Sequence, residues 1–249
     1  MRVATWNIGG GFISKAKESK FTLEEIEYFI NELKKINPDI VCFQEIHIST
    51  KNDQPKRIAK ELNFNFVKTE VIADSHLKEK ENLAISIISK YTIISSKFNK
   101  LPNPKLQAIW NGKKVISHDK GFLEVKIKYK DTPIRVLSGH MVPFDKFERD
   151  FLENDFKKIR EEIQKIIIQR KIPTIICADM NFEDINALIP KIFKLRFSSI
   201  LENYPTEPKG KMYDKLIISK EWTYSNSKII KGKADHYLCF ADVELRKNN

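Results

Sequence analysis

Cysteine is scarce in this sequence, and the few cysteines present have no spacing that would build a metal cage. Three occur among 249 residues, at Cys42, Cys177 and Cys239, and none is part of a CxxC pair. Each lies in an apolar run of the kind that forms a buried strand, so we expect three thiols in the core. Nothing in the sequence resembles a cysteine or histidine cage for zinc.

Long apolar runs and linkers are also missing. Residues 1–20 show no charged head followed by a long apolar stretch, and the later apolar runs are far shorter than a membrane span. We therefore expect no membrane segment and a cytoplasmic protein. No repeat, low-complexity block or Ser/Gly-rich linker divides the chain. This favours a single domain over residues 1–249, which we expect to be a monomer.

Acidic residues are in the minority. The 44 Lys and Arg residues against 33 Asp and Glu residues give a net charge of +11 and an isoelectric point near 9.4. A positive field of this size attracts phosphate-rich partners, so nucleic acid is the expected partner, with DNA favoured over RNA. A second interpretation stays open, in which lysine is simply abundant in the composition and is scattered over a solvated surface.

Short strands rich in Ile and Val dominate the predicted elements. We expect them at residues 2–7, 40–44, 83–89, 91–95, 115–117, 123–129, 134–138, 174–178, 215–219, 222–225 and 237–245. The segment 130–133 predicts a turn that makes its two neighbouring strands an antiparallel hairpin. Many strands with two or three helices predict two sheets packed face to face, with the helices outside.

Two helices are expected to cover these sheets. The first begins at a capping box formed by Thr22 and Glu25, and the segment 37–39 ends it. Its apolar stripe contains Ile26, Phe29, Ile30, Leu33 and Ile36. The second helix is expected from about residue 145 to residue 170, before Pro173, with Phe151, Ile159, Ile163 and Ile166 on one face.

Polar side chains follow the predicted strands at the points where they end. Asn7, Glu45, His140 and Asp179 each come after an apolar run, and Asp235 and His236 come just before the last strand. Strand ends can bring together residues that are far apart in sequence, so we expect these side chains to converge at one edge. Carboxylate and amide oxygens suit a hard cation such as Mg²⁺ or Mn²⁺.

Each of these residues has a plainer interpretation when taken alone. Glu45 would be a surface carboxylate, and His140 and His236 would be satisfied core histidines. Gly9–Gly11 is interpreted as a flexible rim, because no Lys-Ser/Thr pair follows to make a P-loop.

The other histidines, His47, His76 and His118, have no motif that supports a functional role. Asp119 and Lys120 are explained equally well as residues that border the site and as a hairpin turn.

Five short motifs, in this order along the chain, resemble those of the endonuclease/exonuclease/phosphatase family. They are Ala4-Thr5-Trp6-Asn7, Phe43-Gln44-Glu45, Ser138-Gly139-His140, Ala178-Asp179-Met180-Asn181 and Ala234-Asp235-His236. One triplet is weak, whereas the ordered set is strong. The resemblance spans residues 2–245 and implies an α+β fold, a four-layered α/β/β/α sandwich of two mixed sheets flanked by helices, like that of DNase I.

The resemblance also implies a role for each matched residue. Glu45 would be the principal metal ligand, with Asn7 and Asp235 close to the metal or the phosphate, and the expected ion is Mg²⁺ with Mn²⁺ as a substitute. The implied catalytic residues are His140, Asp179, Asn181, Asp214 and His236, and the implied substrate contacts are Asn7, His140 and Asn181. Asp214 would orient the catalytic histidine, His236, through a hydrogen bond.

These roles describe a metal-dependent phosphoric ester hydrolase, and we expect a nuclease or a DNA-repair phosphodiesterase. One alternative keeps the chemistry and moves it to inositol phosphates or other small or lipid phosphoesters. A second alternative is a nucleic-acid-binding protein of this fold without turnover. The polar connections 9–20, 102–120 and 203–211 are the expected substrate-facing loops.

Overall fold

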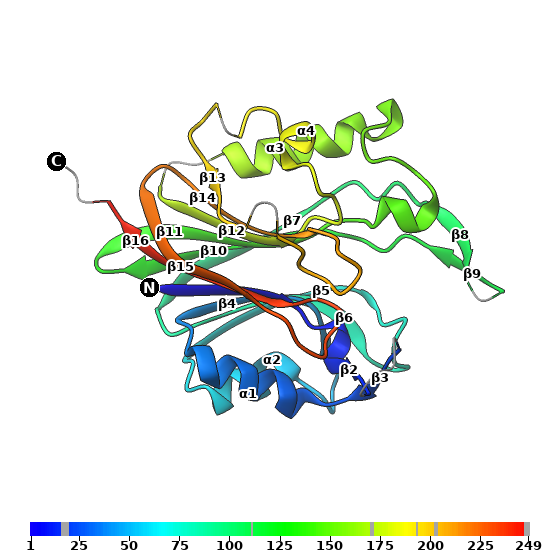
Figure 1. The fold of residues 1–249 in the computed structure, drawn as a ribbon, viewed down its shortest axis with the longest axis horizontal. Helices are drawn as coiled ribbons and strands as arrows, with labels where there is room; N and C mark the ends of the chain where they lie inside the picture. The colour runs from blue at the N-terminus through cyan, green and yellow to red at the C-terminus, as the bar shows by residue number, and fades with distance from the viewer. Residues whose placement is uncertain (16–19, 111, 170–171, 193, 202–203, 247–249) are drawn as a thin grey trace.

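A computed structural model of the chain describes residues 1–15, 20–110, 112–169, 172–192, 194–201 and 204–246. Two six-stranded sheets pack face to face in it (Figure 1). The first has the order β15 (Trp222–Ile230), β16 (Leu238–Leu245), β1 (Arg2–Asn7), β4 (Ile40–Ile48), β6 (Asn82–Ser89), β5 (Phe66–Asp74). The second has the order β13 (Ser198–Ser199), β14 (Asp214–Ile218), β12 (Thr174–Asp179), β11 (Thr132–His140), β10 (Gly121–Tyr129), β7 (Ile93–Lys100).

Helices cover the outer face of each sheet. α1 (Ile26–Ile36) and α2 (Gln54–Glu61) lie below the first sheet in Figure 1, and α3 (Lys157–Ile168) and α4 (Ile185–Leu188) lie above the second. β1 pairs with β4 and β11 pairs with β12 in parallel, while the other pairs are antiparallel, so both sheets are mixed. The expected four-layered α/β/β/α sandwich is therefore confirmed.

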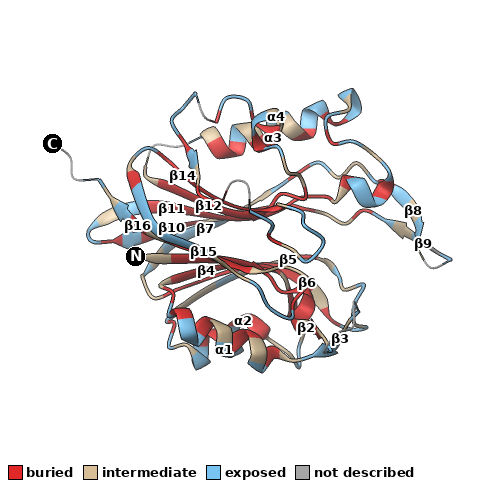
Figure 2. Ribbon diagram, viewed as in Figure 1, coloured by how far each residue is buried: buried red, intermediate tan, exposed pale blue. Residues whose placement is uncertain are grey.

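The apolar core has three layers, one between the sheets and one under each pair of helices. The surfaces on which the sheets face each other, and the sides of the helices that face the sheets, are buried (Figure 2). Cys42, Cys177 and Cys239 are all fully buried and free in the middle layer, as expected. Among the described residues, no helix is long and apolar enough to cross a membrane.

The first helix has the predicted apolar stripe but not the predicted start. Its five stripe residues are buried, and Asn37 ends it in a left-handed conformation with φ of 45°. The capping box is wrong, because Phe21–Glu24 forms the short strand β3 instead, which pairs with β2 (Phe12–Ser14). α1 begins at Ile26, and its preceding residue Glu25 makes no side-chain cap.

The second helix is much shorter than predicted. Residues 144–147 and 154–156 form separate 3₁₀ turns, Glu148 between them is left-handed, and α3 starts only at Lys157. Phe151 lies outside the helix and stacks on Phe144, with ring centroids 4.1 Å apart. The packing of these two rings thus holds residues 144–156 in an irregular conformation, where the apolar spacing predicted a helix. The predicted end at residue 170 lies outside the described residues.

Two β-hairpins that the strand pattern did not predict extend from one end of the sandwich. They are β2–β3 and the pair β8 (Gln107–Trp110) and β9 (Lys113–Ile116), of which only the last strand had been expected in part. β1 starts at the N-terminus on the left of Figure 1, and its carboxyl end lies at the end of the sandwich from which β8–β9 projects. The hairpins therefore flank the edge at which the polar strand ends meet.

Candidate functional site

Strand register places most of the predicted residues at this one edge. β1 and β4 are parallel with Asn7 opposite Gln44, and β11 and β12 are parallel with His140 opposite Asp179. β14 runs antiparallel to β12, so its first residue, Asp214, is the register partner of Asp179. Parallel neighbours end at the same edge and an antiparallel neighbour begins there, which is why these side chains meet.

Hydrogen bonds and close contacts link the residues of the two sheets. Asn7 Nδ2 donates to Asp179 Oδ2 over 2.9 Å, and both side chains are almost fully buried. His140 Nε2 lies 3.5 Å from Asp179 Oδ2 and 3.7 Å from Glu45 Oε1. The seam between the sheets is therefore closed by polar contacts at this end, whereas apolar packing fills its middle.

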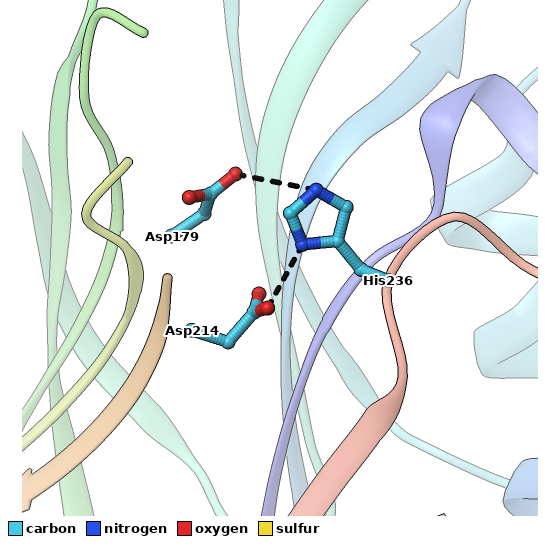
Figure 3. Close-up of side chains that lie close together, drawn as sticks. All are labelled: Asp179, Asp214 and His236. Atoms are coloured by element: carbon cyan, nitrogen blue, oxygen red, sulfur yellow. Dashed lines mark hydrogen bonds and ion pairs between the residues drawn. The ribbon is translucent and has the colours of Figure 1, made fainter. Parts of the chain in front are cut away.

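His236 lies between two carboxylates, with one ring nitrogen facing each (Figure 3). Its Nδ1 is 2.8 Å from Asp214 Oδ2, and its Nε2 is 3.8 Å from Asp179 Oδ2. Burial works to lower the pKa of His236, but the charges of Asp214 and Asp179 outweigh it and raise the pKa well above its ordinary value. The two carboxylates therefore favour the charged ring, and Asp214 fixes its orientation.

Glu45 does not follow its strand as predicted but lies inside it. β4 continues to Ile48 across a bulge between Phe43 and Ile46, and Glu45 sits at this bulge with φ of 51°. A bulge re-aims a side chain, and a left-handed Glu is a strained conformation of the kind found at functional sites. The bulge turns this carboxylate toward His140.

Lys120 lies against the ring of His140 inside the site. Its ammonium is 3.0 Å from both ring nitrogens, and the residue is 6% exposed. Burial lowers the pKa of Lys120 to about 8, although Glu45 and Asp179 act to raise it. Burial and the Lys120 charge together hold the pKa of His140 well below its ordinary value, so this ring is neutral at pH 7.

His140 and Lys120 both act on the charge of Glu45. Burial acts to raise the pKa of Glu45, and the charges of His140 and Lys120 bring it down to about 2. Glu45 is thus a carboxylate over the whole working range of pH.

Asp235 and its neighbours have the chemistry of a cation site. Asp235 Oδ1 is a buried oxygen without a hydrogen-bond partner among the described residues, and burial raises the pKa of this carboxyl. Glu45, Asp179 and Asp214 add three more carboxylates to the edge, against the cations Lys120, His236 and the nearby Lys146. An orphaned buried oxygen and an excess of carboxylates fit a divalent cation, which prefers oxygen ligands.

A second group has metal-ligand composition, and its Asp214 Oδ1 also lacks a hydrogen-bond partner among the described residues, but its histidine is already held by a carboxylate. Ligand atoms of Asp179, Asp214 and His236 lie within 4.8 Å of one another. The short His236–Asp214 hydrogen bond uses the imidazole Nδ1, so this group is better explained as an oriented histidine than as a cation site. Glu45 and Asp235, with the amide of Asn7, are the residues that could hold the ion.

Asn181 is placed beside Asp179 by two hydrogen bonds. Its backbone N–H donates to Asp179 Oδ1 over 2.9 Å, and its Nδ2 donates to the carbonyl oxygen of Met141 over 2.9 Å. Asn181 has φ of 46°, a left-handed conformation that Asn tolerates better than most residues. Its amide oxygen has no protein partner in the described part of the chain, so it remains available to a ligand.

The three glycines do not form the predicted flexible rim. Gly9–Gly11 is a buried 3₁₀ turn, and a Cβ on Gly10 would lie 2.3 Å from His47 Cε1. A Cβ on Gly9 would lie 3.1 Å from Asp235 Oδ1. The turn therefore allows close approach of the backbone to Asp235, and His47 packs beneath it and bonds Ser75 Oγ at 2.7 Å.

A cleft of about 840 Å³ opens from Asp235 and His236. Lysines at positions 146, 209 and 211 line it, and the predicted loop 203–211 forms one wall. Tyr213 Oη donates to Asp145 Oδ2 over 2.8 Å and so ties the two walls together. Residues 16–19 of the predicted loop 9–20, residue 111 of the predicted loop 102–120 and residue 203 lie outside the described residues.

Two residues near the centre were missed or left undecided by the sequence pattern. Lys120 had an equally good explanation as part of a turn. Glu207, which the charges of His236, Asp179 and Asp214 reach, had no explanation at all. The rings of His76 and His118 contact each other, with centroids 5.5 Å apart, on loops beside the site. No spacing or periodicity marks any of these four residues.

Known proteins resemble this chain in sequence pattern and in fold. Residues 4–228 match the Endonuclease/Exonuclease/phosphatase family. No curated protein matches the chain by sequence.

Solved structures of the same architecture include an endonuclease/exonuclease/phosphatase from Beutenbergia cavernae, which is 14% identical with a TM-score of 0.74 over 98% of this chain and 71% of that chain. The human Nocturnin catalytic domain with bound sulfate is 18% identical with a TM-score of 0.68, over 99% and 93% of the two chains. A mannosyl-6-phosphatase from Bacteroides thetaiotaomicron is 12% identical with a TM-score of 0.62, over 98% and 100%.

At these identities the structural likeness shows a shared fold, and the family match covers most of the sequence. The chain therefore belongs to the endonuclease/exonuclease/phosphatase family, whose members are phosphoester hydrolases.

Proposed function

We propose that this protein is a divalent-metal-dependent phosphodiesterase that cleaves nucleic acid, with DNA as the substrate to test before RNA. The observation that carries the proposal is the convergence of Glu45, Asp235, Asp179 and His236 at one edge of the sandwich, although they are far apart in sequence. Phosphodiester cleavage needs neutralised phosphoryl oxygens, an in-line nucleophile and help for the leaving oxygen.

Glu45, Asp235 and Asn7 are the proposed holders of the ion, with Mg²⁺ expected and Mn²⁺ as a substitute. Oxygen donors of this kind and the orphaned Asp235 oxygen support this choice. When bound, a divalent cation supplies positive charge to the phosphoryl oxygens and makes a bound water more acidic.

The proton-handling residues are His236 and Asp179. His236 Nδ1 is held by Asp214, so Nε2 is the atom that exchanges protons with the reaction centre. Asp179 Oδ2 lies 3.8 Å from Nε2, and burial raises the pKa of Asp179, so this carboxyl can accept a proton at its Oδ2. We propose that Asp179 accepts the proton of the attacking water at its Oδ2, while the charged His236 donates from Nε2 toward the reaction centre and the Asn181 amide orients the water.

The positive charge supports nucleic acid as the substrate. The chain carries +11 overall, and three lysines line the cleft that opens from His236. Lys211 is paired with Glu183 over 3.1 Å, whereas the exposed Lys146 and Lys209 extend toward solvent without a carboxylate partner in the described part of the chain. The sulfate bound to the Nocturnin catalytic domain supports binding of phosphate-like anions by this fold.

The test is hydrolysis by the purified protein with Mg²⁺ or Mn²⁺ across abasic duplex DNA, single- and double-stranded DNA, RNA, 5′-tyrosyl DNA, inositol phosphates and sphingomyelin. Chelator and Glu45→Ala are the negative controls. Asp131→Asn is the matched control, because Asp131 is an exposed turn residue bound only to Lys128 in the described structure.

Cleavage of DNA that is lost with chelator and in Glu45→Ala supports the proposal. Cleavage of only inositol phosphates or sphingomyelin would keep the chemistry and replace the substrate. Binding of DNA without any hydrolysis would favour a non-catalytic member of the fold.

A further inference from the structure

Lys120 is a buried cation whose donors are not accounted for by the protein. An ammonium carries three N–H donors, and a neutral imidazole offers one acceptor nitrogen. The only hydrogen-bond partner of Lys120 Nζ among the described residues is the His140 ring. In that part of the chain no carboxylate oxygen lies within 4.0 Å of Lys120. Two of its donors are therefore unused.

The backbone fixes the direction of this side chain. Lys120 directly precedes β10, and its carbonyl oxygen accepts a hydrogen bond from the Leu101 N–H over 2.9 Å. A Cβ on the next residue, Gly121, would lie 2.5 Å from the Asn99 carbonyl oxygen, so the strands approach too closely for any other residue there. Asp119 is held at the surface by Asn103 and Lys100, which leaves Lys120 directed inward.

A purely structural role does not explain such a residue. Burying an ammonium without an ion-pair partner costs stability, and proteins keep such groups mainly where they have a function. An ammonium cannot bind a cation, because it has no lone pair and repels positive charge. An anion that enters the site would supply the partner that Lys120 lacks.

We propose that Lys120 is a substrate-binding residue whose ammonium, placed by His140, binds a non-bridging oxygen of the scissile phosphoryl group. His140 lies within 4 Å of Asp179 and Glu45, which brings the unused donors to the centre of the site. This role for Lys120 rests on the proposed function, which is what makes the bound anion a scissile phosphoryl group. It does not depend on which alcohol carries the phosphate.

The experiment measures binding of inorganic phosphate by calorimetry to the wild type, Lys120→Met, Lys120→Arg and Lys126→Met, each with and without Mg²⁺. Lys126 is the matched control, because it is an exposed lysine on the same strand. We expect Lys120→Met to bind phosphate about tenfold or more weakly, Lys120→Arg to recover part of the affinity, and Lys126→Met to match the wild type. Circular dichroism establishes that each variant is folded.

Phosphate binding that is unchanged in folded Lys120→Met would overturn the proposal. If Lys120→Met does not fold, the same comparison is made with Lys120→Gln, and unchanged binding there overturns it equally. With any substrate that the wild type cleaves, kcat/KM of Lys120→Met should fall about 10²-fold. Phosphate binding can be measured without a substrate. If the wild type cleaves nothing but Lys120→Met still binds phosphate more weakly than the wild type, the proposed function is refuted and the role of Lys120 is not.

Discussion

His236 Nδ1 lies 2.8 Å from Asp214 Oδ2, and this hydrogen bond joins the segment that leads into β16 of one sheet to β14, an inner strand of the other. The Asp214 side chain is fully buried, so its charge acts on the imidazole with little screening by water. The bond fixes which nitrogen of His236 faces the reaction centre.

Asp214→Asn should therefore impair turnover strongly while leaving the fold intact. An amide in this place no longer selects the tautomer or stabilises the imidazolium, and loss of such a partner lowers kcat by about 10²- to 10⁴-fold. Steady-state kinetics with Asp131→Asn as control measures this effect. Wild-type kcat in Asp214→Asn would show that His236 needs no orienting carboxylate.

The same variant has a distinct effect on stability against pH. The pKa of His236 is raised above 6.5 in the folded protein, so the stability it contributes is fully present below pH 6.5 and is lost as pH rises through the folded value. Asp214→Asn removes the main positive contribution to that shift. Urea unfolding in chelator should show a larger deficit for the variant at pH 6 than at pH 9, and an equal deficit at both would contradict the assignment.

Asn7→Asp tests the link between the two sheets. Asn7 Nδ2 donates to Asp179 Oδ2 over 2.9 Å, whereas its Oδ1 accepts from the Gly9 N–H, a bond that an aspartate retains. The substitution therefore replaces one buried hydrogen bond by two facing carboxylates and should cost about 2 kcal/mol or more at pH 7. The loss should shrink near pH 4, because one protonated carboxyl restores a donor; a loss independent of pH would count against this explanation.

Gly10→Ala tests the buried turn beneath Asp235. Gly10 has φ of 68° and its Cβ would collide with the His47 ring, so a cost of about 2 kcal/mol or more is expected. Gly210→Ala is the matched control, because Gly210 has φ of 85° with nothing within 4 Å of its Cβ. That variant should lose only about 1 kcal/mol from the left-handed backbone. Equal losses in thermal unfolding would mean that His47 moves aside freely.

Lys120→Met should stabilise the free protein while it impairs function. The pKa of Lys120 falls from 10.5 to about 8 on folding, so the buried charge opposes folding below pH 8, and stability is regained as pH rises from about 8 to 10.5. Met keeps the volume and removes the charge, which should add up to about 3 kcal/mol at pH 7. Urea unfolding at pH 7 and pH 9 checks this, and a destabilised variant at pH 7 would contradict it.

The sequence was sufficient to predict the layers of the fold and the convergence of the polar residues. Apolar runs marked the buried strands, and a polar residue directly after such a run stood out at Asn7, His140 and Asp179. The register that makes His140 a neighbour of Asp179 depends on parallel pairing between strands, which local spacing does not encode. The resemblance to a family supplied that part.

Other features depend on tertiary contacts and were out of reach. The bulge at Glu45 has no turn residue to mark it, and Lys120 is one lysine in a chain with 44 basic residues. Phe151 has the spacing of a helical residue but packs on Phe144 in an irregular segment. The apolar periodicity therefore predicted a helix where aromatic packing holds a loop. The single domain and the monomer stay predictions.

The most direct test of the account is a calorimetric titration of Mn²⁺ and Mg²⁺ into chelator-treated protein, comparing the wild type with Glu45→Gln and with Asp131→Asn. Glu45 and Asp235 are the proposed ligands, so Glu45→Gln should bind the ion at least tenfold more weakly while Asp131→Asn binds as the wild type does. Undiminished binding by folded Glu45→Gln, or no binding by the wild type, would contradict the claim that this edge of the sandwich holds a divalent cation.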